Sequence, residues 1–192
     1  MYKIIVNKMK LHHLILTEED EIIFRYGLEL LLNALVSVSV LLTISALLGY
    51  FNETIIFYLT YLFLKKNTGG YHAESHVGCI LQFNLFCFLL FLFYRYGLLP
   101  IHETGILSLL IISVFFFAPL EDKNKKITDE QFQKHKKACL VKLAFITALC
   151  ICLRLFHVTQ NSLYDFFYLG LLMVSITVLL GTLKKYITKD GK

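Results

Sequence analysis

Charged residues are scarce in this chain of 192 residues. Only 17% of the residues are Asp, Glu, Lys or Arg, whereas 57% are apolar. A typical soluble domain carries about 25% charged residues, so this composition argues against a soluble protein. The charges also lie in a few clusters, which leaves long stretches of the chain nearly free of them. Such stretches are typical of a protein embedded in a membrane.

The chain also lacks the features of a secreted, disulfide-stabilised protein. The first 27 residues contain no apolar core followed by small residues, so we expect no cleavable signal peptide. The five cysteines are odd in number, and four of them fall in or beside apolar stretches: Cys87, Cys139, Cys150 and Cys152. We therefore expect no disulfide framework.

Six apolar stretches approach the length that a membrane-spanning helix needs, which is about 20 residues. They cover residues 28–48, 50–64, 80–96, 101–120, 138–156 and 163–183. The second stretch is the shortest, so we expect a tilted or partial span there. The sequence thus predicts an all-α, polytopic membrane protein with about six transmembrane helices.

The residues before the first stretch are interpreted as an amphipathic helix that lies on the inner leaflet. Thr17 is followed by four acids, and a hydroxyl before acids is typical of a helix start, because both stabilise the positive N-terminal end. We expect one integral-membrane domain over the whole chain. It comprises the amphipathic lead-in (1–27), the transmembrane bundle (28–183) and a short cytoplasmic tail (184–192).

The basic residues predict the orientation of the bundle. In a six-span arrangement, all but two of the 19 Lys and Arg residues lie on one side of the membrane, and the exceptions are Arg95 and Arg154. Cytoplasmic loops carry the excess of basic residues, so both termini are expected in the cytoplasm. Moving one span would scatter the charges over both sides, so their pattern itself favours six spans.

A short polar segment between the second and third stretches holds a histidine and a cysteine. It covers residues 65–79 and reads Lys-Lys-Asn-Thr-Gly-Gly-Tyr-His-Ala-Glu-Ser-His-Val-Gly-Cys. A cysteine attacks carbonyl groups as its thiolate, and a neighbouring imidazole can accept the thiol proton. His72 precedes Cys79 by seven residues, or two helical turns, so the two side chains would share one face of a helix. The predicted orientation places this segment at the cytoplasmic face.

Other interpretations of this segment remain open. His72 and His76 have the spacing of two zinc ligands on a helix, but the zincin motif requires Glu directly after the first His, where this chain has Ala73. No third ligand is obvious, so we expect neither a metal nor another cofactor. Cys79 could instead be a small apolar residue of the interior. His76, one turn before Cys79, is also geometrically acceptable as a base.

Polar side chains on the first stretch need partners, because they are costly to expose to lipid. Glu29, Asn33 and Ser37 recur every four residues and form one polar stripe. Glu29 is expected near the cytoplasmic end, at a depth similar to that of Cys79. It is interpreted either as an interfacial carboxylate or as a buried acid that orients the imidazole.

Two amides, Gln82 and Asn84, begin the third stretch just after the cysteine. Either could donate a hydrogen bond to an oxyanion that develops during catalysis. Hydrogen bonding between neighbouring helices is the simpler interpretation, and we favour it.

The segment 65–73 followed by Cys79 resembles the signature of the accessory gene regulator B (AgrB) family. A second block at 118–127, Ala-Pro-Leu-Glu-Asp-Lys-Asn-Lys-Lys-Ile, resembles that family's cytoplasmic Ala-Pro segment with its basic cluster. The chain length, the six apolar stretches and the amphipathic lead-in agree as well, so the resemblance covers nearly the whole chain. Asn124 within the basic run and the lack of a proline after Lys126 depart from many members.

The resemblance implies a membrane-embedded cysteine endopeptidase of Gram-positive bacteria, active at the cytoplasmic face of the cell membrane. Such enzymes process a small amphipathic quorum-sensing propeptide, of the AgrD type, into a cyclic thiolactone or lactone signal. His72 and Cys79 would form the catalytic pair. Membrane lipids are the other expected partners, a homodimer is left open, and no nucleic acid is expected.

Lys123, Lys125 and Lys126 begin a basic loop between the fourth and fifth stretches. This loop is expected to anchor the chain to anionic lipid of the inner leaflet. The three lysines are also interpreted as a binding site for an acidic propeptide tail, which adds to the anchoring role without excluding it.

Two functions of other classes compete with the peptidase. A small transporter or peptide exporter would place ionisable residues near the middle of the membrane, and the apolar stretches offer no convincing example there. A structural membrane adaptor would not require the pairing of His72 with Cys79.

Overall fold

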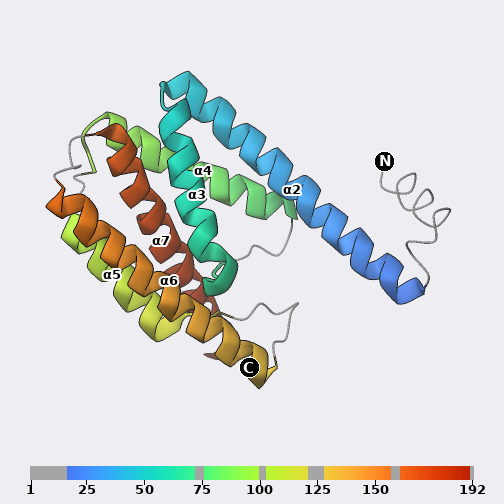
Figure 1. Cartoon of the computed structure of the whole chain (residues 1–192). Coiled ribbons are helices and arrows are strands. Elements are labelled where there is room, and N and C mark those ends of the chain that lie inside the picture. Colours follow the sequence, from blue (N-terminus) through green and yellow to red (C-terminus); the bar gives the residue numbers. More distant parts are fainter. Residues whose placement is uncertain (1–16, 72–75, 100–102, 121–127, 157–160, 191–192) are drawn as a thin grey trace.

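The computed structural model describes residues 17–71, 76–99, 103–120, 128–156 and 161–190. Every regular element within these ranges is an α-helix (Figure 1). The helices are α2 (Glu18–Leu48), α3 (Phe51–Thr68), α4 (His76–Arg95), α5 (Glu103–Phe117), α6 (Asp129–Leu155) and α7 (Ser162–Asp190). The expectation of an all-α protein is therefore confirmed.

The six helices coincide with the six apolar stretches, although not all of them are long enough to span a membrane. Four helices in the described part of the chain have the necessary length and apolar composition, namely α2, α4, α6 and α7. Helix α5 is apolar but has only 15 residues. The structure thus supports a membrane protein, while the number of six spans and the cytoplasmic position of both termini stay predictions.

Helix α2 begins where the sequence predicted a helix start. The Thr17 side chain accepts a hydrogen bond from the Asp20 backbone N–H, and the Asp20 carboxylate accepts one from the Thr17 backbone N–H, both at 3.1 Å. This reciprocal pair satisfies two donors that a helix start otherwise leaves unpaired. The helix then continues to Leu48, with no break between the expected lead-in and the expected first span. Residues 1–16 lie outside the described part of the chain.

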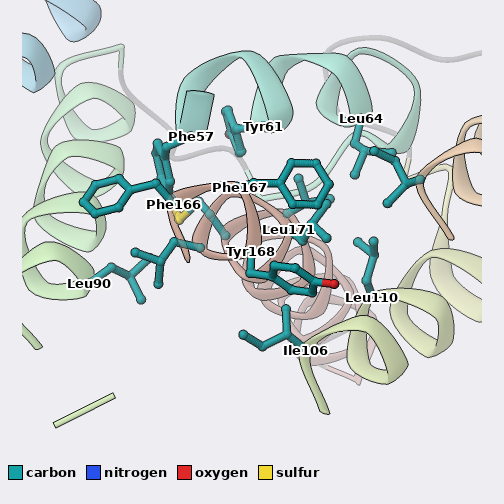
Figure 2. Packing of buried hydrophobic residues seen from close by; sticks show 14 of the residues in the cluster. Phe57, Tyr61, Leu64, Leu90, Ile106, Leu110, Phe166, Phe167, Tyr168 and Leu171 are labelled. Atoms are coloured by element: carbon teal, nitrogen blue, oxygen red, sulfur yellow. The ribbon is translucent and has the colours of Figure 1, made fainter. Parts of the chain in front are cut away.

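Helix α7 lies at the centre of the bundle and contributes most to its core. Figure 2 shows Tyr168 of α7 beside side chains of α5, and Phe166 of α7 near side chains of α3 and α4. The ring of Phe166 lies 5.0 Å from that of Phe91 on α4, measured between centroids. By contrast, α2 exposes many large apolar side chains, and its N-terminal half extends beyond the other helices in Figure 1. Such an exposed apolar surface is what a lipid-facing helix requires.

Two glycines of α7 allow the chain to pack closely against this helix. A Cβ atom at Gly170 would lie 2.8 Å from the carbonyl oxygen of Phe57 on α3. A Cβ atom at Gly181 would lie 2.8 Å from the backbone of Gly70, in the segment that follows α3. The two glycines are three helical turns apart and therefore share one face of α7. Small residues at helix interfaces are a common means of close packing in membranes. Here they allow α3 and the segment after it to lie close against α7.

Candidate active site

The backbone after α3 is held between α7 and the segment that follows α5. The N–H of Tyr71 donates a hydrogen bond to the carbonyl oxygen of Thr177 at 2.8 Å. The N–H of Leu120 donates one to the carbonyl oxygen of Thr68 at 3.0 Å. These two bonds bring the polar segment and the Ala-Pro block together, although about fifty residues separate them in the sequence.

The glycine pair is required by this crowded position. Gly69 and Gly70 have φ angles of +66° and +133°, which residues with a Cβ atom rarely adopt. A Cβ atom at Gly69 would lie 2.4 Å from the carbonyl oxygen of Leu120, and one at Gly70 would lie 2.4 Å from the Nζ atom of Lys65. The backbone conformation therefore disfavours larger residues at both positions. At Gly69 the Leu120 backbone also leaves no space for a Cβ atom, whereas at Gly70 the lysine side chain would have to move.

Cys79 lies in the first turn of α4 and is partly exposed. The N-terminal end of a helix favours a negative charge, because the peptide dipoles align there. His72 lies outside the described residues, and of His76 only the backbone is described. The predicted pairing of His72 with Cys79 therefore stays a prediction, and so do the roles of Lys123, Lys125 and Lys126, which also lie outside.

The other four cysteines occupy positions less suited to attack on a peptide. None of the five forms a disulfide, and Cys87, Cys139 and Cys150 are buried. Cys152 is exposed, but it lies near the C-terminal end of α6. That position is about 25 Å along the helix from His135, whose ring nitrogen is 3.3 Å from the Asn67 amide at the end of α3. Cys79 is thus the cysteine that combines exposure with the end of the bundle where the polar segment lies.

Lys65 is a residue of this region to which the sequence assigned no role. Its Nζ atom is buried and has no hydrogen-bond partner in the described part of the chain. The ammonium lies 5.9 Å from the centre of the Tyr61 ring. That ring contacts the ring of Phe83, one turn after Cys79, at 5.1 Å between centroids, so Lys65 lies near the start of α4. Lys65 is one residue beyond the expected second span, and burial lowers its pKa from the usual value to about 8. A lysine at the end of an apolar stretch normally indicates an interfacial anchor, so only the packing reveals this one as buried.

Glu29 pairs with Arg25 on the same helix. The Nε atom of Arg25 lies 3.2 Å from the Glu29 carboxylate, and both side chains are partly exposed. Further along the polar stripe, the Asn84 amide donates a hydrogen bond to the Ser37 hydroxyl at 3.0 Å. The helix–helix interpretation of Asn84 is therefore confirmed. A contact between Glu29 and His72 lies outside the described residues, so the role of Glu29 as an orienting acid stays a prediction.

Two lysines of helix α6, Lys136 and Lys142, donate hydrogen bonds to backbone carbonyl oxygens of other helices or of the segment after them. The Nζ atom of Lys136 donates to the carbonyl oxygens of Phe115 and Ala118, the latter at 2.7 Å, and so satisfies the C-terminal end of α5. Lys142 donates to the carbonyl oxygen of Phe63, near the end of α3, and its Nζ atom lies 4.7 Å from the centre of the Phe63 ring. A positive charge near the C-terminal end of a helix is favourable. Not every lysine of this basic region is therefore free to bind substrate or lipid.

The described residues contain no group of three or more His, Cys, Asp or Glu that could hold a metal ion. Because His72 and the side chain of His76 lie outside those residues, this observation does not test the alternative of a metal bound by the two histidines. The chemistry that the described part offers is that of a partly exposed thiol beside a buried ammonium.

Comparison with known proteins identifies the family. The family described as Accessory gene regulator B matches residues 2–178. Accessory gene regulator protein B of Staphylococcus aureus (strain bovine RF122 / ET3-1) is 28% identical over 160 residues, which cover 81% of this chain and 80% of that protein. A putative AgrB-like protein of Listeria innocua is 22% identical over 136 residues, covering 70% of this chain and 67% of that protein. No solved structure matches the chain significantly. Because the family match extends over most of its length, the chain belongs to the accessory gene regulator B (AgrB) family.

Proposed function

We propose that this protein is a membrane-embedded cysteine endopeptidase that processes a small propeptide of accessory gene regulator quorum sensing. The observation that carries the proposal is the position of Cys79, which is partly exposed in the first turn of α4 beside the buried Lys65 ammonium. Family membership supports the biological setting. The apolar helices support a site at the membrane boundary.

In the proposed first step, His72 accepts the thiol proton of Cys79, and the thiolate attacks a peptide carbonyl of the substrate. A carbon–sulfur bond forms, the peptide carbon–nitrogen bond breaks, and the imidazolium returns its proton to the departing amine. The N-terminal part of the propeptide is then held on Cys79 as a thioester, and the C-terminal fragment leaves.

In the proposed second step, a cysteine thiol of the substrate replaces water as the nucleophile. His72 accepts its proton, the new thioester forms within the substrate, and Cys79 regains its proton as the enzyme–substrate bond breaks. One thioester replaces another of similar energy, so ring closure requires no ATP. Hydrolysis would compete with this exchange, and a site at the edge of an apolar bundle favours the exclusion of water.

The remaining residues of the proposal act on binding and orientation. Glu29 would orient the imidazole of His72, as the third group of a hydrolytic triad does. Lys123, Lys125 and Lys126 would bind the acidic tail of the propeptide. Membrane lipid would hold the amphipathic part of the same substrate.

Incubation of the purified protein with its propeptide tests the proposal directly. Mass spectrometry should reveal an acyl adduct on Cys79, with a mass equal to that of the N-terminal fragment. The Cys79→Ala variant should insert normally into membranes and process nothing. Cys152→Ala is the matched control, because Cys152 is exposed but lies near the other end of α6, and this variant should process like wild type. Full processing by Cys79→Ala would exclude the proposed chemistry.

A further inference from the structure

The Lys65 ammonium is an unusual charge in this protein, because it is buried without a hydrogen-bond partner among the described residues. Burying a charge is costly unless an opposite charge or several acceptors compensate for it. The next residue, Lys66, is exposed and follows the ordinary behaviour of an interfacial lysine. The cost at Lys65 therefore needs a specific explanation.

The surroundings of Lys65 indicate what compensates for the charge. Its Nζ atom lies against the backbone of Gly70 on one side and near the Tyr61 ring on the other, 5.9 Å from the ring centre. The rings of Phe57 and Phe91 and those of Tyr61 and Phe83 lie 5.1 Å apart, measured between centroids, so α3 and α4 run antiparallel. Lys65 follows Tyr61 by one turn and Cys79 precedes Phe83 by one turn, so the same pairing brings Lys65 near Cys79. The ammonium thus lies between the glycine segment and the start of α4. An anion formed at Cys79 would be the opposite charge that Lys65 lacks.

We propose that Lys65 is a positioning residue of the thiol site, whose buried ammonium stabilises the thiolate form of Cys79. This inference deepens the proposed function and rests on Cys79 as the nucleophile. An opposite charge beside a titrating group changes the population of its charged form by about tenfold or more. Burial lowers the pKa of Lys65 to about 8, and an anion beside the ammonium would favour its charged form.

Gly70 determines where the ammonium can lie. A Cβ atom at Gly70 would come within 2.4 Å of the Lys65 Nζ atom, and within 3.1 Å of the Thr177 carbonyl oxygen. Because Gly70 has no side chain, the ammonium has room to lie close to the backbone and away from solvent. A substitution at Gly70 should displace the charge while leaving Lys65 in the sequence.

The rate of Cys79 alkylation by iodoacetamide measures the proposed effect without any substrate. This reagent is neutral, so removing a lysine does not change its attraction to the protein, and it reacts with the thiolate. The variants are Lys65→Met, which removes the charge but keeps a long side chain, and Lys66→Met, which removes the exposed neighbouring charge. Peptide mass spectrometry separates Cys79 from Cys152, which serves as the internal reference.

We expect Lys65→Met to slow alkylation of Cys79 at pH 7 by about tenfold and to move the half-maximal rate to higher pH. Alkylation of Cys152 should not change, and Lys66→Met should behave like wild type. An unchanged profile of Cys79 in Lys65→Met would overturn the proposal. Among the described residues, the titratable groups to consider in the profile are Tyr61 of α3 and Cys87 of α4. Tyr71 is a further one, and its ring lies 4.9 Å from the Lys184 ammonium of α7.

A second pair of variants keeps the test decisive if Lys65→Met folds poorly. Gly70→Ala should slow Cys79 alkylation, because the added methyl group displaces the ammonium. Gly49→Ala also places a side chain at a positive φ angle, +83°, but meets nothing within 4 Å, so it should leave the rate unchanged. Equal rates in both variants would contradict the proposal. Because alkylation needs no propeptide, a failure here is distinguishable from a failure of the proposed peptidase activity, which is read from Cys79→Ala and processing.

Discussion

The backbone N–H of Leu120 donates a hydrogen bond to the carbonyl oxygen of Thr68 across 3.0 Å. This bond joins the end of α3 to the segment that follows α5. It supplies a donor to one of the last carbonyl groups of α3, which a helix end leaves unpaired. It also places Leu120, the last described residue of the Ala-Pro block, beside the glycine pair. The basic loop begins directly after Leu120 in the sequence.

His72, and not His76, is expected to be the base. His72→Ala should abolish processing, because the proposed acceptor of the thiol proton is lost, whereas His76→Ala should retain most of the activity. The measurement is propeptide processing by the two variants at equal protein levels in membranes. Activity should also be blocked by thiol alkylation and be insensitive to chelators. Loss of activity in His76→Ala alone would reverse the assignment, and inhibition by chelators would favour the metal alternative.

Substitution of Gly181 is expected to disturb the site from the opposite helix. A Cβ atom there would lie 2.8 Å from the backbone of both Gly70 and Tyr71. Gly181→Ala should therefore lower the stability in detergent by about 1–3 kcal/mol, as overpacking does, and should reduce processing. Gly27→Ala is the matched control, because this helical glycine meets nothing within 4 Å. That variant should be neutral or more stable by about 0.5–1 kcal/mol, as read from thermal unfolding; equal destabilisation of the two variants would exclude the packing argument.

Glu29 is expected to assist the catalytic pair. Glu29→Gln keeps the hydrogen-bonding shape but removes the charge, so processing should slow while membrane insertion stays normal. Arg25→Gln is an informative companion, since Arg25 pairs with Glu29 at 3.2 Å. If the Glu29 carboxylate acts only by pairing with Arg25, the two variants should have the same small effect on the processing rate, because an exposed ion pair contributes little stability. A processing rate equal to that of wild type in Glu29→Gln would reduce the residue to an interfacial carboxylate.

Lys123 and Lys125 are expected to act together in substrate capture. Exposed charge pairs contribute about 0.2–1 kcal/mol each, so the double Gln variant should raise the KM for propeptide more than it lowers kcat. The effect should fade at high salt, which screens exposed charges. Identical kinetics of variant and wild type at low salt and limiting substrate would leave the loop as a lipid anchor.

Lys136→Gln is the structural counterpart of that double variant. Lys136 donates to the carbonyl oxygens of Phe115 and Ala118, so its loss should lower the stability by about 1 kcal/mol or more. Substrate capture at a temperature where the variant stays folded should be unaffected. A raised KM without loss of stability would instead assign Lys136 to the substrate site.

Local patterns in the sequence were sufficient for the helical elements and for the start of α2. The apolar stretches are long, and their composition leaves no other way to satisfy the backbone in a membrane. Thr17 and Asp20 are three residues apart, so their reciprocal capping bonds depend only on local spacing. A hydrogen bond from Asn84 to a neighbouring helix was also predicted, because amides within apolar helices must find partners. The partner is Ser37 of α2.

The tertiary structure alone decided the environment of Lys65 and the fit of the glycine pair. By sequence Lys65 and Lys66 are equivalent, and only the packing of α3 against its neighbours buries the first ammonium and exposes the second. Likewise, Gly69 and Gly70 indicate a turn, but their need for empty space comes from Leu120 at Gly69 and from Lys65 and Thr177 at Gly70. Residues distant in the sequence meet there, and burial depends on such non-local contacts, which no local pattern encodes.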